Sequence, residues 1–119
     1  MSELIVTKVG EVAIVNFVGT EILDMAQSKA IGIKLCATVE QPDVSCLVID
    51  FGRVKLITSS MIGELIQVRK KSAERQVILK LCSLSSELIK LLKLLKLDKS
   101  FEIYASRELA VKALQANKK

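Results

Sequence analysis

The chain has 119 residues, of which 50% are apolar and 26% charged, so we expect one folded domain over residues 1–119 rather than a disordered tail. It has no histidine, which excludes His-based catalytic triads and dyads and His-ligated zinc. The net charge is +5 but is unevenly distributed: residues 1–59 carry 5 basic and 7 acidic side chains, and residues 60–119 carry 13 basic and 6 acidic side chains. The basic second half could attract an anionic partner or be an ordinary solvated surface.

The first elements are predicted to be a β-hairpin followed by a helix. Residues 4–9 and 12–18 are apolar, β-branched runs separated by Gly10-Glu11, which is typical of two paired strands. Residues 22–40 then take a helical period, and Pro42 ends that helix. The positions at helical spacing on one face are Leu23, Ala26, Ala30, Ile33 and Ala37.

The remaining chain alternates strands and helices. Residues 46–49 and 77–81 are continuous apolar runs, typical of strands covered on both faces, and residues 101–104 form a short last strand. Helices are predicted over about residues 59–73, 85–95 and 106–116. In the first of these, the residues at helical spacing are Ile62, Leu65, Ile66 and Arg69. In the last, the inward-facing residues are Leu109, Ala110 and Leu114.

This order, β-β-α-β-α-β-α-β-α, predicts an α/β fold with a mixed sheet of four or five strands and about four helices. The later strands should be parallel, because a helix fills each crossover. We expect the main helices to gather on one face of the sheet, since the opening hairpin leaves the other face less well covered.

Cys36, Cys46 and Cys82 are far apart and form no CxxC pair. They are predicted to be small apolar core residues rather than disulfide partners or metal ligands. No signal-peptide pattern opens the sequence and no apolar run exceeds four residues, so we expect a cytoplasmic protein without a membrane span.

A strand-to-helix junction is the most informative segment of the sequence. A buried strand ends at Asp50, and a loop then leads to Thr58-Ser59-Ser60-Met61-Ile62-Gly63, where a helix begins. The first backbone N–H groups of a helix lack helical partners and suit an anion, so a hydroxyl here is well placed to carry a phosphate. Taken locally, the two serines are better explained as ordinary capping residues.

The whole pattern resembles STAS domains, in particular the bacterial anti-sigma factor antagonists. In that family an apolar strand ending in Asp leads to Asp-Ser-Ser/Thr-Gly-Leu-Gly at a helix start, and residues 58–63 align with this motif. The segment from Gly19 to Asp24 and the segment from Leu79 to Tyr104 are also similar to the family. Two residues depart from the pattern: Thr58 replaces the family's Asp, and Met61 replaces its first Gly.

The resemblance implies that Ser60, rather than Ser59, is phosphorylated. It also implies a partner-binding surface around it, formed by Asp24, Thr58, Ser59, Met61 and Gly63. The expected partners are an anti-sigma factor that is also a Ser/Thr kinase and a phosphatase that resets the site. The family further implies a transcription regulator that is a binding module and not an enzyme, with no cofactor, no metal and no catalytic residue.

Three alternatives stay open. The departures at residues 58 and 61 favour a scaffold STAS domain that assembles with its own copies or with related domains. The basic second half could bind nucleic acid, although Phe17, Phe51 and Phe101 lie in apolar strand-like contexts and supply no stacking platform, so we expect no specific binding. Lys90, Lys93 and Lys96 alternate with leucines, so that helix either turns its leucines inward or docks on a membrane or partner.

Overall fold

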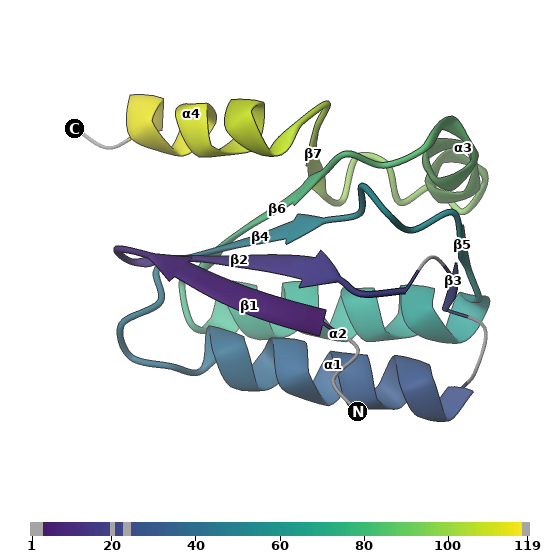
Figure 1. Cartoon of the computed structure of the whole chain (residues 1–119), viewed down its shortest axis with the longest axis horizontal. Helices are drawn as coiled ribbons and strands as arrows, with labels where there is room; N and C mark the ends of the chain where they lie inside the picture. Colours follow the sequence, from purple (N-terminus) through teal and green to yellow (C-terminus); the bar gives the residue numbers. More distant parts are fainter. Residues whose placement is uncertain (1–3, 20, 23–24, 118–119) are drawn as a thin grey trace.

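The computed structural model describes residues 4–19, 21–22 and 25–117. These residues form an α/β fold with a mixed five-stranded sheet and four helices, which confirms the predicted class and, apart from two short added strands, the predicted element order (Figure 1). The elements are β1 (Leu4–Val9), β2 (Val12–Phe17), β3 (Glu21–Ile22), α1 (Met25–Val39), β4 (Cys46–Asp50), β5 (Leu56–Ile57), α2 (Ser59–Glu74), β6 (Ile78–Cys82), α3 (Ser86–Leu94), β7 (Glu102–Tyr104) and α4 (Arg107–Asn117).

The main sheet has the strand order β1-β2-β4-β6-β7. β1 and β2 are antiparallel, whereas β2, β4, β6 and β7 are parallel, so the sheet is mixed as predicted. The hairpin turns at Gly10, whose φ of 62° a glycine adopts without strain. The two edges differ in length, because β1 has six residues and β7 has three.

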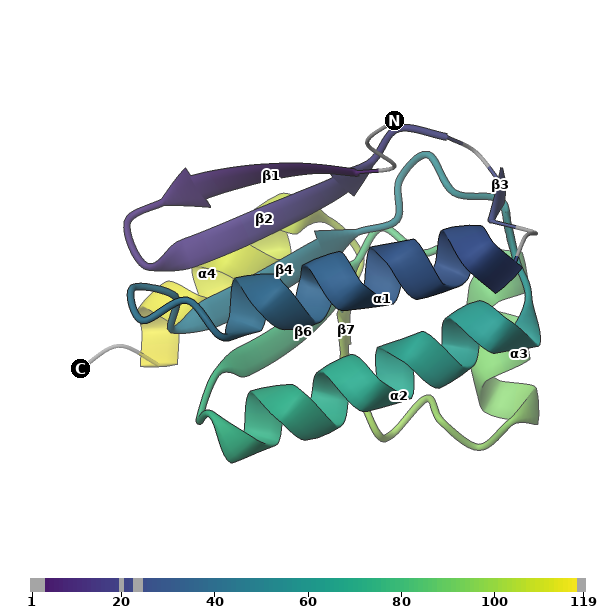
Figure 2. The ribbon, with the colours of Figure 1, turned by 90° about the horizontal axis from the view of Figure 1, so that it is seen from below.

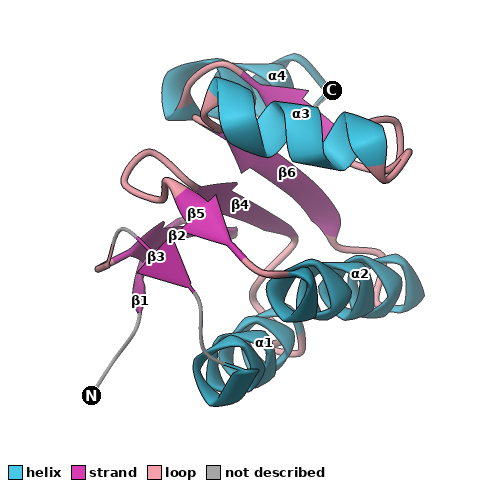
Figure 3. Ribbon diagram, turned by 90° about the vertical axis from the view of Figure 1, so that its right-hand side faces the viewer, coloured by secondary structure: helices cyan, strands magenta, loops and turns pink. Residues whose placement is uncertain are grey.

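Two short strands escaped prediction. β3 and β5 have two residues each and pair in parallel as a separate small sheet (Figure 3). A two-residue strand is too short to show a period of two, so the sequence contains no signal for it. β5 lies immediately before Thr58, and this pairing therefore fixes the chain where it enters α2.

The helices cover both faces of the sheet, unequally. α1 and α2, the two longest helices, lie side by side beneath one face (Figure 2), where they enclose the larger core. α4 packs on the opposite face through Ala110 and Leu114, against Ile14, Val48 and Cys82. The expectation of one helical face therefore holds for α1 and α2 and is wrong for α4.

Two predicted helix faces need correction. In the predicted stripe, Ala26, Ala30, Ile33 and Ala37 of α1 are exposed, and Leu23 lies outside the described residues. The buried side chains of α1 are instead Ser28, Ile31, Leu35, Thr38 and Val39. In α4 Leu109 is exposed, although Ala110 and Leu114 are buried as expected. Alanine is compatible with either face of a helix, so in α1 the larger Ile31, Leu35 and Val39 decide which side enters the core.

The leucine-rich helix α3 begins as predicted. Ser85 caps it, its side chain accepting a hydrogen bond from the backbone N–H of Leu88. Leu88 and Leu92 enter the core, while Leu94 and the lysines at 90, 93 and 96 are exposed. Of the helices in the described residues, none combines the length and apolarity needed to cross a bilayer.

Candidate functional site

The Thr58–Gly63 segment lies at the end of the sheet where the parallel strands finish. β4 ends at Asp50, and Phe51 then turns into the core, where its ring centroid is 5.1 Å from that of Phe17. Val54 is buried too and donates its backbone N–H to the carbonyl of Phe51 at 2.9 Å. These buried side chains anchor the loop that carries the chain to α2.

Asp50 fastens the start of that loop. Its Oδ1 accepts a hydrogen bond from the backbone N–H of Gly52 at 2.8 Å, and its Oδ2 lies 3.4 Å from Nε of Arg107, the first residue of α4. Asp50 is only 9% exposed, so this ion pair is partly shielded from water. One carboxylate therefore ties the candidate loop to the helix on the other face of the sheet.

Three hydroxyl groups meet where α2 begins, and we call Ser28, Thr58 and Ser60 the hydroxyl cluster. The Oγ1 of Thr58 and the Oγ of Ser60 are 2.8 Å apart, within hydrogen-bond distance. The Ser60 hydroxyl also points to Oγ of Ser28 at 3.5 Å, a long contact. Ser60 is consequently half-buried between the beginnings of α2 and α1.

The cluster lies at a helix start that carries no negative charge. Thr58 occupies the N-cap position in an extended conformation, but its side chain makes no capping hydrogen bond, and the first turn of α2 has no acidic residue. The carbonyl of Thr58 accepts from the N–H groups of Met61 and Ile62 at 3.1 and 3.2 Å. The positive end of the α2 dipole is thus not balanced by an acidic side chain in this turn.

The other predicted site residues fall in different environments. Ser59 and Gly63 are exposed, and a β-carbon built on Gly63 would meet nothing within 4 Å. Met61 is fully buried, so its side chain supports the helix from the core and does not contact a partner directly. This corrects its place in the predicted binding surface. Asp24 lies outside the described residues.

Sequence reasoning missed Ser28. It is 1% exposed and belongs to the buried face of α1, one turn before Ile31. Its spacing to Ile31 and Leu35 follows the helical period, so the larger apolar residues of α1 mark Ser28 as an inward position. A serine on a buried helix face needs a polar neighbour, and Ser60 is that neighbour.

The cysteines lie away from the hydroxyl cluster and behave as core residues. Burial raises the pKa of Cys46 to about 12 and that of Cys82 to about 11, so both remain protonated thiols at neutral pH. Cys36 is half-buried, and burial also raises its pKa. Within residues 4–19, 21–22 and 25–117, no three Cys, Asp or Glu side chains gather closely enough to hold a metal ion.

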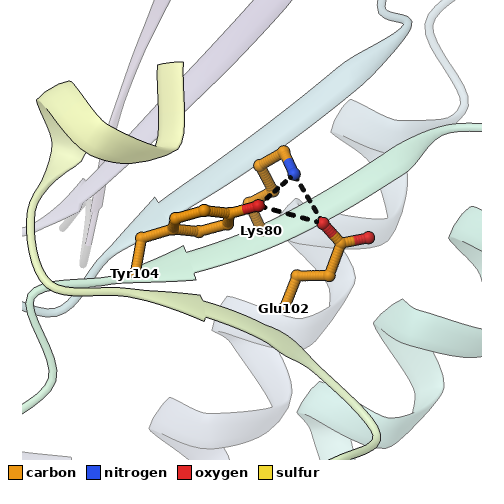
Figure 4. Close-up of polar contacts among 3 residues, drawn as sticks. All are labelled: Lys80, Glu102 and Tyr104. Atoms are coloured by element: carbon orange, nitrogen blue, oxygen red, sulfur yellow. Dashed lines mark hydrogen bonds and ion pairs between the residues drawn. The ribbon is translucent and has the colours of Figure 1, made fainter. Parts of the chain in front are cut away.

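A buried lysine forms a second polar cluster, on the α4 face of the sheet (Figure 4). Lys80 of β6 is 0% exposed, and its Nζ donates to Oε1 of Glu102 at 2.5 Å and to the hydroxyl of Tyr104 at 2.9 Å. Burial alone would lower the pKa of Lys80, but the hydrogen bonds to these two β7 residues outweigh it and raise the pKa. The cluster joins β7 to the sheet and leaves no free amine for chemistry.

The basic run near the end of α2 is occupied by contacts within the chain. The guanidinium of Arg69 lies 5.8 Å from the ring centroid of Phe101, and Nζ of Lys71 is 3.1 Å from the carboxylate of Glu40. Arg75 donates to the carbonyl of Glu40 at 3.0 Å. These three charges are engaged separately rather than aligned as one stripe.

Comparison with known proteins places this geometry in a family. The family model described as "STAS domain" matches residues 3–110. A STAS domain protein from Planctomyces limnophilus, described as an anti-sigma factor antagonist, has a TM-score of 0.86 at 22% identity, covering 96% of this chain and 99% of that one. None of the curated proteins matches the sequence.

Two further solved structures show how widely the fold is used. The anti-sigma factor antagonist SpoIIAA in its unphosphorylated form has a TM-score of 0.80 at 17% identity, covering 95% of this chain and 96% of that one. The murine anion transporter Slc26a9 has a TM-score of 0.75 at 16% identity, covering 92% of this chain but only 18% of the transporter. At these identities the structural likeness shows the fold.

Proposed function

Because the chain belongs to the STAS domain family, as the match over residues 3–110 shows, we propose that it is an anti-sigma factor antagonist controlled by phosphorylation of Ser60. In this proposal the unmodified protein binds an anti-sigma factor that is also a Ser/Thr kinase, and phosphorylation ends the complex until a phosphatase restores it. The observation that carries the proposal is the position of Ser60, in a hydroxyl cluster at the uncharged start of α2.

The helix start suits a phosphoryl group. Phosphorylation adds about −1.5 to −2 charges at pH 7. With no acidic residue in its own first turn, α2 offers its positive dipole end to that charge. The fold should therefore survive modification, whereas a protein partner seated on the same surface would have to desolvate a dianion.

The surroundings of Ser60 fit a protein partner. Ser59 and Gly63 near it in α2 are exposed, and so are two apolar side chains of adjoining elements: Met25, the first residue of α1, is 75% exposed, and Leu56 of β5, two residues before Thr58, is 49% exposed. A polar centre with apolar groups beside it offers both hydrogen bonds and area to bury. Thr58 and Asp24 complete the proposed surface, and no step of the proposal requires catalysis by this chain.

Substitution of Ser60 tests the proposal. We expect Ser60→Ala to fold and to stay bound to the kinase whatever its activity, and Ser60→Asp to fold but to bind at least tenfold more weakly, measured by titration calorimetry. Ser59→Ala is the matched control and should still carry its phosphate on Ser60, as read by mass spectrometry. Phosphate on Ser59 or Thr58 in place of Ser60 would contradict the proposal.

A scaffold STAS domain without a working phosphoswitch is the second candidate. Half-burial of Ser60 and its contacts with Thr58 and Ser28 favour it, because a kinase must first turn the hydroxyl outward. Incubation with an active cognate kinase separates the two: stoichiometric phosphate on Ser60 supports the switch, and no phosphate supports the scaffold.

A further inference from the structure

β1 is an open edge of the main sheet. It pairs with β2 on one side, and in the part of the chain that the structure describes no strand pairs with its other side. Figure 1 shows it at the margin of the sheet, with α4 lying over β4, β6 and β7 instead. A six-residue edge strand presents backbone donors and acceptors that can pair with another chain.

The uncovered face of this edge is apolar. Ile5, Thr7 and Val9 point to the same face, because side chains alternate along a strand. Ile5 is 57% exposed and Val9 is 62% exposed. Two large apolar side chains on one exposed edge strand are a feature that natural sheets ordinarily avoid unless the edge is used.

The charged side chain of this edge strand, Lys8, is paired with an acidic residue of its own chain. Lys8 is the charged residue of β1, and it points to the opposite face, where it forms a hydrogen-bonded ion pair with Asp43. The hydrogen bond from Lys8 lowers the pKa of Asp43. Lysines on edge strands normally oppose pairing with a second chain, but this one is neutralised within its own chain.

The hairpin turn determines which backbone groups face outward. Gly10 and Glu11 form a two-residue turn with a positive φ at Gly10, the pattern of a type II′ turn, so Val9 and Val12 form a hydrogen-bonded pair. Because such pairs alternate along an antiparallel ladder, Thr7 and Ile5 also turn their backbone groups toward β2. Val6 and Lys8 therefore turn theirs toward the open edge.

We propose that β1 pairs with β1 of a second copy, antiparallel and around a two-fold axis at Thr7. Val6 then exchanges backbone hydrogen bonds with Lys8 of the second copy, and Thr7 faces its own counterpart. In this register Ile5 lies opposite Val9 of the second copy, and the reverse pair forms by symmetry. A shift by two residues would oppose Ile5 to Thr7 instead, and a shift by one would misalign the outward backbone groups.

The partner of β1 is a second copy of the chain, because Ile5 and Val9, the two residues that would lie opposite each other, both belong to β1. In a two-fold interface residue i contacts residue j and j contacts i, and Ile5 and Val9 satisfy this about Thr7 with apolar side chains on both sides. No member of the hydroxyl cluster takes part. The pairing is thus independent of whether Ser60 is phosphorylated.

Charge substitution at the paired positions tests the register. Wild-type protein should show a concentration-dependent dimer in sedimentation velocity. The variant I5K/V9K opposes two lysine pairs and should raise the dimer Kd at least tenfold, whereas I5K/V9E opposes Lys to Glu and should restore dimerisation. Both variants keep two charged side chains at exposed positions, and circular dichroism confirms that they fold. A monomeric wild type, or an I5K/V9K variant that dimerises like the wild type, would overturn the proposal.

A cysteine at the axis supplies an independent readout. Thr7 and its counterpart would form a pair without hydrogen bonds, with Cα atoms about 4.5 Å apart, which allows a disulfide. In a Cys36→Ala background, Thr7→Cys should form a disulfide-linked dimer on mild oxidation, much faster than the control Leu109→Cys at an exposed position of α4. Equal rates for the two variants would contradict the pairing.

Discussion

Glu64 of α2 rests its carboxylate against Gly32 of α1, in the space that a β-carbon on residue 32 would occupy. Gly32 is buried, and Cβ of Glu64 would lie 3.0 Å from such an added atom. Gly32 therefore allows α1 to pack closely on α2. The contact lies at Glu64, one turn after Ser60 in α2. By contrast, a β-carbon on Gly63, the residue before Glu64, would meet no atom within 4 Å.

The same substitution at these two glycines should have opposite effects on stability. Alanine favours a helix over glycine by about 0.5–1 kcal/mol, so Gly63→Ala should raise the free energy of unfolding by about that amount. Gly32→Ala must turn the flexible carboxylate end of Glu64 aside and also crowds Cβ of Glu64 at 3.0 Å, so we expect a net loss of up to about 1 kcal/mol. Urea unfolding measures both.

A double variant checks the cause. Gly32→Ala combined with Glu64→Ala should recover only part of the loss, because Oε1 and Cδ of Glu64 are then gone whereas its Cβ, 3.0 Å from the added atom, remains. If Gly32→Ala alone has the same free energy of unfolding as the wild type, the contact between Glu64 and residue 32 does not constrain the packing of α1 on α2. In the proposed function, Gly63→Ala should weaken binding to the anti-sigma partner even though it stabilises the fold.

Restoring a carboxylate at residue 58 should stabilise α2. Thr58→Asp places an acceptor and a negative charge at an N-cap that has no side-chain hydrogen bond, which is worth about 0.5–1 kcal/mol. Thr58→Val keeps the shape but removes the hydroxyl next to Ser60, so it should not stabilise. Thermal unfolding at low salt distinguishes them, and an equal Tm for both variants would exclude capping as the cause.

Lys80 and Glu102 should show strong energetic coupling. Glu102→Gln leaves a buried ammonium without its charged partner, and we expect a loss of about 1.5–3 kcal/mol. Lys80→Met combined with Glu102→Gln should lose less than the sum of the two single variants. Additive losses in this double-mutant cycle would show that the hydrogen bond contributes little.

Lys80 and its partners also predict how the stability of the fold depends on pH. The pKa of Lys80 is raised above its ordinary value of 10.5, since the hydrogen bonds that Lys80 donates to Glu102 and Tyr104 outweigh burial. Its stabilising contribution is therefore fully present below about pH 10.5 and is lost as the pH rises through the raised pKa. Lys80→Met should flatten the alkaline fall in stability, and an unchanged fall in that variant would assign it to other groups.

Asp50 should stabilise the fold through two separate interactions. Asp50→Ala removes both the acceptor for Gly52 and the partner of Arg107, and we expect a loss of about 1–3 kcal/mol. Asp50→Asn keeps the acceptor for Gly52 but lacks the charge, so it should lose less. Denaturant unfolding of both variants, compared with Arg107→Ala, apportions the loss between the loop and α4.

The fold was predictable where the sequence has a clear period or an uninterrupted apolar run. The run ending at Asp50 and the hairpin around Gly10 are local signals, and both elements occur where expected. The side of the sheet that α4 covers is not local information, because an amphipathic helix shows which of its own faces is buried and not which sheet face it meets.

The candidate site was predictable as a segment but not as an arrangement of side chains. The position of Ser60 at a helix start follows from the sequence, whereas its contact with Ser28 depends on how α1 crosses α2, 32 residues away. Burial of Met61 could have been anticipated, since Met61, Leu65 and Val68 follow the helical period. The exposed alanines of α1 concealed the true inner face, because alanine gives little information on burial.

The unequal edges of the main sheet limit how far it can grow. If two copies join along β1, both long edges are used, and the continuous sheet then ends on each side in β7, which has three residues. So short an edge offers few hydrogen bonds to a further chain, and α4 follows it directly. Assembly through strand pairing therefore closes at two copies and does not propagate into a filament.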